Sequence, residues 1–87
     1  MTRDEIFSCI SEIIGDQISM DAPKSKSDKL LDLGVDSIGL MALIVYLEEK
    51  LEIQVSIEEI ADLDSYGEGV TIDNIIDVVQ KSLDDSK

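Results

Sequence analysis

Histidine is absent from this 87-residue sequence, and cysteine occurs once, at Cys9. The usual nucleophile pairs, in which a histidine activates a serine or a cysteine, therefore cannot form within the chain. The same absence excludes histidine and cysteine clusters of the zinc-binding kind, and the sequence has no glycine-centred acidic loop of the calcium-binding kind. We predict no catalytic residue and no metal site.

Aromatic residues are also scarce, at 3% of the chain with no tryptophan, whereas 44% of the residues are hydrophobic. The core must therefore consist of isoleucine, leucine and valine, which suits a small helical bundle. Residues 1–87 are enough for one domain. Cys9 has no intrachain partner for a disulfide and lies on an apolar helical pattern, so we expect a buried structural thiol.

Positive charge is rare: seven basic residues against twenty acidic ones give a net charge of −13. Such a charge repels nucleic acid and anionic membrane surfaces and favours partner proteins with basic patches. The longest uncharged run, Ser37 to Leu47, is shorter than the roughly 20 residues that span a bilayer. The first residues include Asp4, Glu5 and Glu12, unlike a signal peptide. We expect a cytoplasmic protein without membrane insertion.

Apolar residues at helical spacing predict four helices. The first follows Thr2 and Glu5, which have capping-box spacing, and Gly15 is its expected terminator. The second begins near Ser37 and ends in charged residues after Leu47. The expected core residues of these two helices are Ile6, Ile10, Ile13 and Ile14, and Leu40, Leu43, Ile44, Leu47 and Leu51.

Two further helices complete the predicted bundle. Ser56 and Glu59, again at capping-box spacing, start a short third helix that the sequence DSYGEG stops, and Thr71 opens a longer fourth helix. Their expected core residues are Ile57, Ile60 and Leu63, and Ile72, Ile75, Ile76, Val79 and Leu83. We predict an all-α four-helix bundle with three longer helices, one short third helix, and a long loop between the first and second.

That loop, from Asp16 to Asp36, shows no regular periodicity. Loops of this length are uncommon in compact domains and are usually functional or held against the core. The residues that we expect to anchor it are Ile18, Leu30, Leu31 and Leu33.

Ser37 lies where this loop becomes the second helix. Serine is a common N-cap residue, and Asp36 could fill the same role one position earlier. However, the sequence DLGVDSI, residues 32–38, resembles the modification motif of acyl carrier proteins. The resemblance covers nearly the whole chain: a helix, a long loop, the motif, a helix that ends in LEEKLEI, a short third helix and a final helix.

The resemblance implies that residues 1–87 form one acyl-carrier-like domain, in which Ser37 carries phosphopantetheine through a phosphodiester and Asp36 helps the modifying enzyme to recognise it. A phosphodiester at a helix start would face unpaired backbone amides and the positive end of the helix dipole. The implied partners are a phosphopantetheinyl transferase and enzymes that load or use acyl groups, of the synthase, acyltransferase or ligase type. The chain would be a monomeric carrier without catalysis of its own.

Immediately after the serine, carriers of fatty-acid synthesis usually have acidic residues, whereas this chain has Gly39 and Ala42. This departure favours a specialised fatty-acid or polyketide-type pathway. A peptidyl or aminoacyl carrier of nonribosomal synthesis is the near alternative, although such carriers commonly have Gly-Gly-x-Ser-like sequences where this chain has GVDS. An acidic protein-interaction module without a prosthetic group is the alternative from another class.

Ile38, Met41 and Val45 form a second apolar stripe on the second helix, at positions i, i+3 and i+7. So small a bundle cannot fully bury both this stripe and the core stripe. We expect Ile38, Met41 and Val45 to dock partner enzymes, with the small residues Gly39 and Ala42 allowing a close approach. The alternative is that the stripe packs under the loop between the first two helices.

Overall fold

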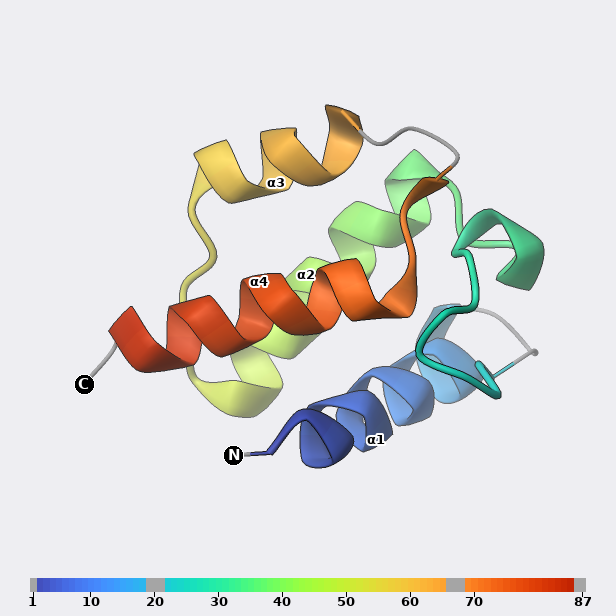
Figure 1. The fold of residues 1–87 in the computed structure, drawn as a ribbon, viewed down its shortest axis with the longest axis horizontal. Helices are drawn as coiled ribbons and strands as arrows, with labels where there is room; N and C mark the ends of the chain where they lie inside the picture. The colour runs from blue at the N-terminus through green and yellow to red at the C-terminus, as the bar shows by residue number, and fades with distance from the viewer. Residues whose placement is uncertain (1, 19–21, 66–68, 86–87) are drawn as a thin grey trace.

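The computed structural model describes residues 2–18, 22–65 and 69–85, and these ranges contain four α-helices and no strand (Figure 1). The helices are α1 (Arg3–Ile13), α2 (Ser37–Leu51), α3 (Ile57–Ser65) and α4 (Ile72–Asp85). A π-helical turn, η1 (Ile14–Ile18), continues α1, and a 3-10 turn, η2 (Leu31–Leu33), lies before α2. The predicted bundle with a short third helix is therefore confirmed.

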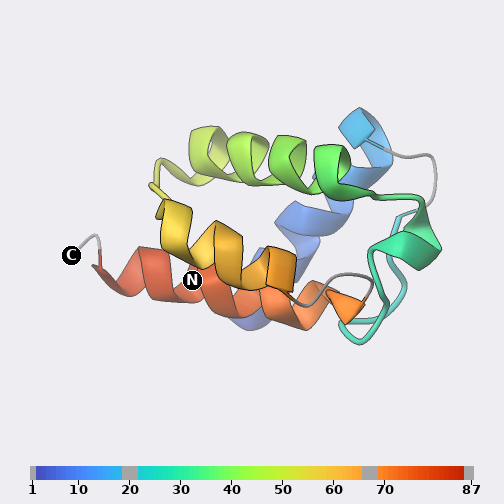
Figure 2. The same ribbon diagram turned by 90° about the horizontal axis from the view of Figure 1, so that it is seen from above.

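The helices pack around α4 and α2. In Figure 1, α4 crosses in front of α2, with α3 above it and α1 below it, and Figure 2 shows α2 and α4 on opposite sides of the bundle. Contacts join α1 to both α2 and α4, and join α3 to α4. A single apolar core fills the space between them.

The predicted core stripes are buried with few exceptions. The fully buried side chains include Ile6, Ile10, Ile14, Leu43, Ile44, Leu47, Leu63, Ile72, Ile75, Ile76 and Val79. The expected residues Leu51, Ile60 and Leu83 are only partly buried, and the side chain of Ile57 lies outside the described part of the chain. Cys9 is also partly buried rather than enclosed, which corrects the prediction of a buried thiol.

Side chains cap the starts of α1 and α4, where the sequence predicted that helices begin. The Thr2 hydroxyl accepts a hydrogen bond from the Glu5 amide, and the Glu5 carboxylate accepts one from the Thr2 amide, which confirms the capping box. At α4, the Thr71 hydroxyl accepts from the Asn74 amide at 3.3 Å and the Asn74 side chain accepts from the Thr71 amide at 2.9 Å. Asparagine thus performs the reciprocal role usually given to glutamate.

The end of α1 differs from the prediction. Gly15 does not terminate a helix; α1 ends at Ile13, and Gly15 lies inside the π-helical turn η1. Ile14 keeps helical dihedral angles, φ −62° and ψ −46°, and its amide donates to the Ile10 carbonyl, so helical backbone continues into η1 instead of stopping at Gly15. The predicted stop at DSYGEG matches the end of α3 at Ser65, while residues 66–68 lie outside the described ranges.

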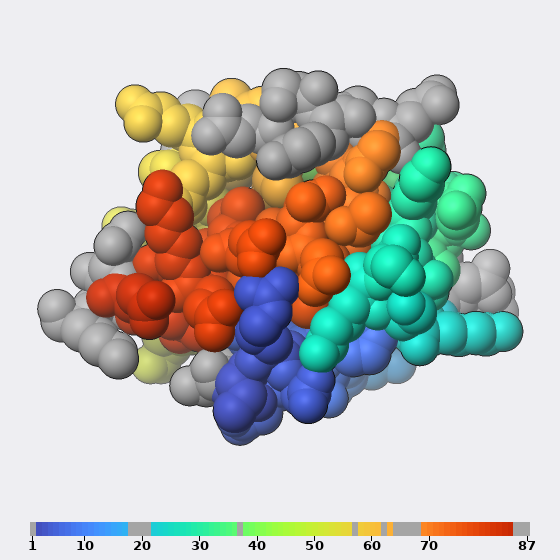
Figure 3. Space-filling model, viewed as in Figure 1, coloured from blue at the N-terminus to red at the C-terminus, as the bar shows by residue number. Residues whose placement is uncertain are grey.

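The loop before α2 is held by its backbone as well as by its side chains. Its Leu30 amide donates to the Val70 carbonyl at 2.9 Å, and the Ile72 amide donates to the Asp28 carbonyl at 3.0 Å. The loop therefore lies against the start of α4, as the space-filling view shows (Figure 3).

The predicted anchors of the loop are only partly confirmed. Leu30 and Leu33 are buried as expected, and Val35 is a further buried anchor. The prediction that Leu31 is an anchor is wrong, because 43% of its surface is exposed. The side chain of Ile18 lies outside the described part of the chain.

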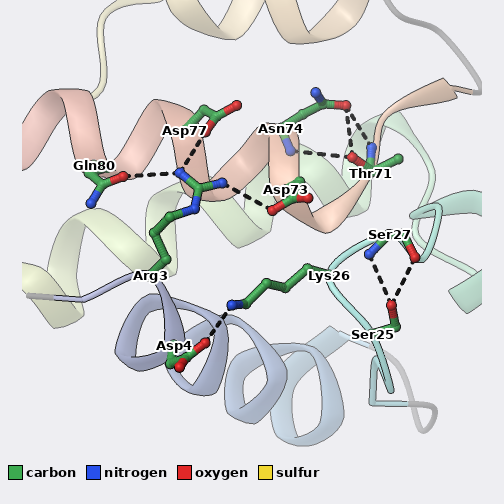
Figure 4. Close-up of polar contacts among 10 residues, drawn as sticks. All are labelled: Arg3, Asp4, Ser25, Lys26, Ser27, Thr71, Asp73, Asn74, Asp77 and Gln80. Carbon is green, nitrogen blue, oxygen red and sulfur yellow. Dashed lines mark hydrogen bonds and ion pairs between the residues drawn. The ribbon is translucent and has the colours of Figure 1, made fainter.

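Charged contacts attach the first helix to its neighbours (Figure 4). Arg3, the sole arginine of the chain, pairs with Asp73 at 3.0 Å and with Asp77 at 2.7 Å on α4. Lys26, in the loop, pairs with Asp4 on α1. The hydrogen bond and charge of Lys26 lower the pKa of the Asp4 carboxyl from its ordinary value.

We predict a pH-dependent effect of Asp4→Asn. The lowered pKa of Asp4 means that its ionised form stabilises the fold above the unfolded-state pKa, and that this contribution is lost as pH falls through the lower folded-state pKa. Thermal melts should therefore show a small decrease in Tm at pH 7, which disappears in strong acid. Asp84→Asn is the matched control, because Asp84 is exposed and lacks an ion-pair partner among the described residues. An equal effect of both variants at pH 7 would contradict the prediction.

Candidate functional site

The segment that leads into α2 is held in one conformation by its backbone. The Gly34 amide donates to the Leu31 carbonyl at 3.1 Å, and the Val35 amide donates to the Leu30 carbonyl at 2.9 Å. Gly34 has φ 81° and ψ 13°, a left-handed conformation in which a side chain would be strained. This turn, with Val35 buried, directs the chain into the start of α2.

Asp36 is the N-cap of α2. Its Oδ1 atom accepts a hydrogen bond from the Gly39 amide at 2.8 Å, and its carbonyl accepts one from the Leu40 amide at 2.8 Å. Of the two N-cap candidates, the structure therefore selects Asp36. Ser37 is the first helical residue, so the capping role does not account for a serine at this position.

The neighbours of Ser37 lie at the protein surface. Asp36 is exposed, and Ile38 has 81% of its surface exposed. The side chain of Ser37 itself lies outside the described part of the structure. The residues on either side of Ser37 are therefore accessible from solvent.

The second apolar stripe of α2 is exposed. Ile38, Met41 and Val45 are 81%, 46% and 48% exposed, while Gly39 and Ala42 beside them are partly buried. Among the described residues, just one other large apolar side chain, Leu31, is exposed to this degree. The alternative, that the stripe packs under the loop, is therefore wrong. The sequence did not predict that Leu31 is exposed. Because it lies among other leucines, it was expected to anchor the loop to the core.

The described ranges contain no group of three or more histidine, cysteine, aspartate or glutamate residues that could hold a metal ion. Nor does any helix within them have the length and apolar character needed to cross a membrane. The exposed stripe beside Ser37 is the feature that distinguishes this end of α2 from the rest of the described surface.

Comparison with known proteins identifies the family. Residues 4–71 match the family model described as phosphopantetheine attachment site. The acyl carrier protein of Clostridium acetobutylicum is 37% identical over 67 residues, which cover 75% of this chain and 87% of that protein. The acyl carrier protein of Kocuria rhizophila is 30% identical over 76 residues, which cover 84% and 94%.

A solved structure has the same fold. The crystal structure of an acyl carrier protein from Thermotoga maritima matches with a TM-score of 0.81 and 22% identity, over 98% of this chain and 94% of that one. The family model, the two relatives and this fold agree with the helix, loop and DLGVDSI arrangement of the sequence. The chain therefore belongs to the acyl carrier proteins, the carrier family whose covalent cofactor is phosphopantetheine.

Proposed function

We propose that Ser37 is the residue to which phosphopantetheine is attached, and that the loaded protein shuttles acyl groups between enzymes. The observation that carries this proposal is the N-cap at Asp36, which leaves Ser37 without that structural role at the head of α2. When bound, the arm supplies a terminal thiol that holds acyl groups as thioesters. The carrier itself has no catalytic role in this proposal.

The residues around Ser37 fit a phosphodiester. The first backbone amides of a helix lack intrahelical acceptors, and the positive end of the helix dipole lies there. In α2 the Gly39 amide donates to the Asp36 carboxylate. The amides of Ser37 and Ile38 come before the first residues whose amides donate within the helix. Exposure of Ile38 leaves space for an arm that extends into solvent.

Asp36 is proposed to contribute to recognition by a phosphopantetheinyl transferase. Its Oδ1 atom fixes the helix start, and the exposed carboxylate adds negative charge next to Ser37. A basic surface on the transferase would be attracted by this charge. The enzyme, rather than the carrier, would remove the proton from the Ser37 hydroxyl, since the chain has no histidine to do so.

Ile38, Met41 and Val45 are proposed to dock the partner enzymes, namely the transferase and enzymes of the synthase, acyltransferase or ligase type. These side chains are exposed, and Gly39 and Ala42 leave little bulk between them. Burial of exposed apolar area gives roughly 25 cal/mol per Å². Apolar contact along this stripe would therefore contribute to docking, in addition to the charge of Asp36.

The uncharged run from Ser37 to Leu47 supports a specialised fatty-acid or polyketide-type pathway. The carrier is proposed to act as a monomer in the cytoplasm. The GVDS sequence argues against the peptidyl or aminoacyl alternative. The mass of the protein purified from its native host would reveal an acyl group still attached.

Intact-mass measurement after incubation with coenzyme A and a broad-specificity phosphopantetheinyl transferase tests the proposal. We expect one phosphopantetheine per chain, located by tandem mass spectrometry on Ser37. An unchanged mass would favour an acidic interaction module without a prosthetic group.

A further inference from the structure

The start of α4 and the loop before α2 complete each other's backbone hydrogen bonds. The first amides of an α-helix have no acceptor within the helix, and in α4 the loop supplies two of the missing acceptors. The Ile72 amide donates to the Asp28 carbonyl at 3.0 Å. The Asp73 amide donates to the Lys26 carbonyl at 2.8 Å. The first turn of α4 therefore holds this part of the loop in place.

Leu30 connects this junction to the segment that leads into α2. Its amide donates to the Val70 carbonyl, just before α4, at 2.9 Å. Its carbonyl accepts the amides of Leu33 at 3.0 Å and Val35 at 2.9 Å, and its side chain is buried in the core. Val35 directly precedes the N-cap of α2, and Ser37 directly follows that N-cap. A short run of backbone hydrogen bonds therefore leads from the start of α4 to the segment that carries Ser37.

Thr71 and Asn74 fix the turn from which this run of hydrogen bonds begins (Figure 4). The Asn74 Oδ1 atom accepts hydrogen bonds from the Thr71 amide at 2.9 Å and from the Thr71 hydroxyl at 3.1 Å. The Thr71 Oγ1 atom in turn accepts one from the Asn74 amide at 3.3 Å. Both residues are half-buried, and Thr71 also forms an antiparallel bridge with Lys29 in the loop. The two side chains therefore stabilise the stretch of backbone to which the loop is bonded.

We infer that Thr71 and Asn74 are positioning residues for the modification of Ser37, acting through the first turn of α4 and the backbone of Leu30. The inference rests on the proposed attachment at Ser37 and deepens it, because it assigns part of the site to a helix that is distant in the sequence. Fixing a loop costs conformational entropy. A carrier whose loop is already fixed spares the transferase this cost when the serine enters its active site. Loosening the start of α4 should therefore weaken productive binding rather than alter the serine hydroxyl.

Thr71→Val and Asn74→Ala test the inference in labelling with coenzyme A and a broad-specificity phosphopantetheinyl transferase. Thr71→Val keeps the branched shape and removes the hydroxyl, and Asn74→Ala removes the acceptor of the Thr71 amide and hydroxyl. Each should raise KM for the carrier about fivefold and change kcat by less than about twofold, which is the pattern of lost binding rather than lost chemistry. Thr71→Ser and Asn74→Asp retain the hydrogen-bonding atoms and should restore the wild-type KM.

Amide hydrogen exchange on the unmodified chain follows the same run of hydrogen bonds without the transferase. The Val35 amide donates to the Leu30 carbonyl and lies outside α4. Thr71→Val and Asn74→Ala should accelerate its exchange at least about tenfold through local opening. Circular dichroism melts identify conditions in which each variant is folded, and exchange is compared there.

Ser56→Ala is the matched control, because it also removes a capping hydroxyl. The Ser56 hydroxyl accepts a hydrogen bond from the Glu59 amide at 3.2 Å at the start of α3. Its loss should lower Tm to a comparable extent, because both changes remove a cap, but should leave KM and Val35 exchange at their wild-type values. Equal effects of Ser56→Ala on either readout would show that general stability controls labelling and would overturn the inference.

Unchanged KM or unchanged Val35 exchange in Thr71→Val and Asn74→Ala would also overturn the inference. If Thr71→Val does not fold, Asn74→Ala and its rescue by Asn74→Asp decide the question. A wild-type chain that is not labelled would refute the proposed function, while the exchange measurement would still test the coupling of α4 to Val35. Labelling of the wild type at Ser37, together with unchanged variants, would refute this inference alone.

Discussion

Replacement of Ser37 by alanine should abolish labelling by coenzyme A and a phosphopantetheinyl transferase, and the protein should remain folded. The change removes the oxygen atom that would form the phosphodiester. Because Asp36 holds the N-cap through its bond to the Gly39 amide, the cap is retained and the free energy of unfolding should change by no more than ~0.5 kcal/mol. Intact mass and thermal melts measure the two effects separately.

Ser56→Ala is the matched control for this variant. Ser56 also lies at a helix start, where its hydroxyl accepts a hydrogen bond from the Glu59 amide at 3.2 Å. Its loss should cost ~0.5 to 2 kcal/mol, the usual cost of removing a cap, while labelling remains complete. Labelling that persists in Ser37→Ala would refute the attachment site. A large loss of stability in that variant would instead show that Ser37 has a structural role.

Much of the fold could be predicted because apolar periodicity reports burial directly. Ile6, Ile10, Leu43, Leu47, Ile75 and Ile76 repeat at helical spacing, and all are buried. The helix starts were equally predictable, since Thr2 and Thr71 cap their helices through local hydrogen bonds. Such contacts depend on neighbouring residues and are therefore encoded locally.

The errors concern features that depend on distant parts of the chain. Gly15 was expected to end α1, but helical backbone continues past it in η1, and the adjacent Ile14 is buried in the core. Leu31 was expected to be buried like Leu30, yet the 3-10 turn that contains it turns its side chain outwards. Spacing alone does not show which of two adjacent leucines faces the core when the surrounding segment is irregular.

The candidate site was predictable in part for the same reason. The second stripe of α2 follows from helical spacing, and the choice of Asp36 over Ser37 as N-cap required the hydrogen bond to the Gly39 amide. A surface hollow that residues of η1 and Tyr46 of α2 line was not predictable, because η1 and α2 are separated by the long loop.

Adjacent positions on α2 allow the docking surface and the core to be tested with one substitution type. Met41 is 46% exposed on the apolar stripe, whereas Leu40 is 4% exposed and belongs to the core. An aspartate at position 40 would place an unpaired carboxylate among apolar side chains, at a cost of at least ~3 kcal/mol. That is a large part of the stability of a domain of this size, which is on the order of 4 to 13 kcal/mol.

Leu40→Asp should therefore lose most of its helical circular dichroism or melt far below the wild type. Met41→Asp should change stability by no more than ~0.5 kcal/mol and should slow transfer to and from partner enzymes several-fold, because the added charge must be desolvated when the stripe is covered. Gln54→Asp adds the same charge at an exposed position outside the stripe and should leave transfer rates unchanged. If Met41→Asp unfolds the protein, Met41 belongs to the core and the docking surface is wrong. If Met41→Asp and Gln54→Asp slow transfer equally, net charge rather than the stripe controls docking.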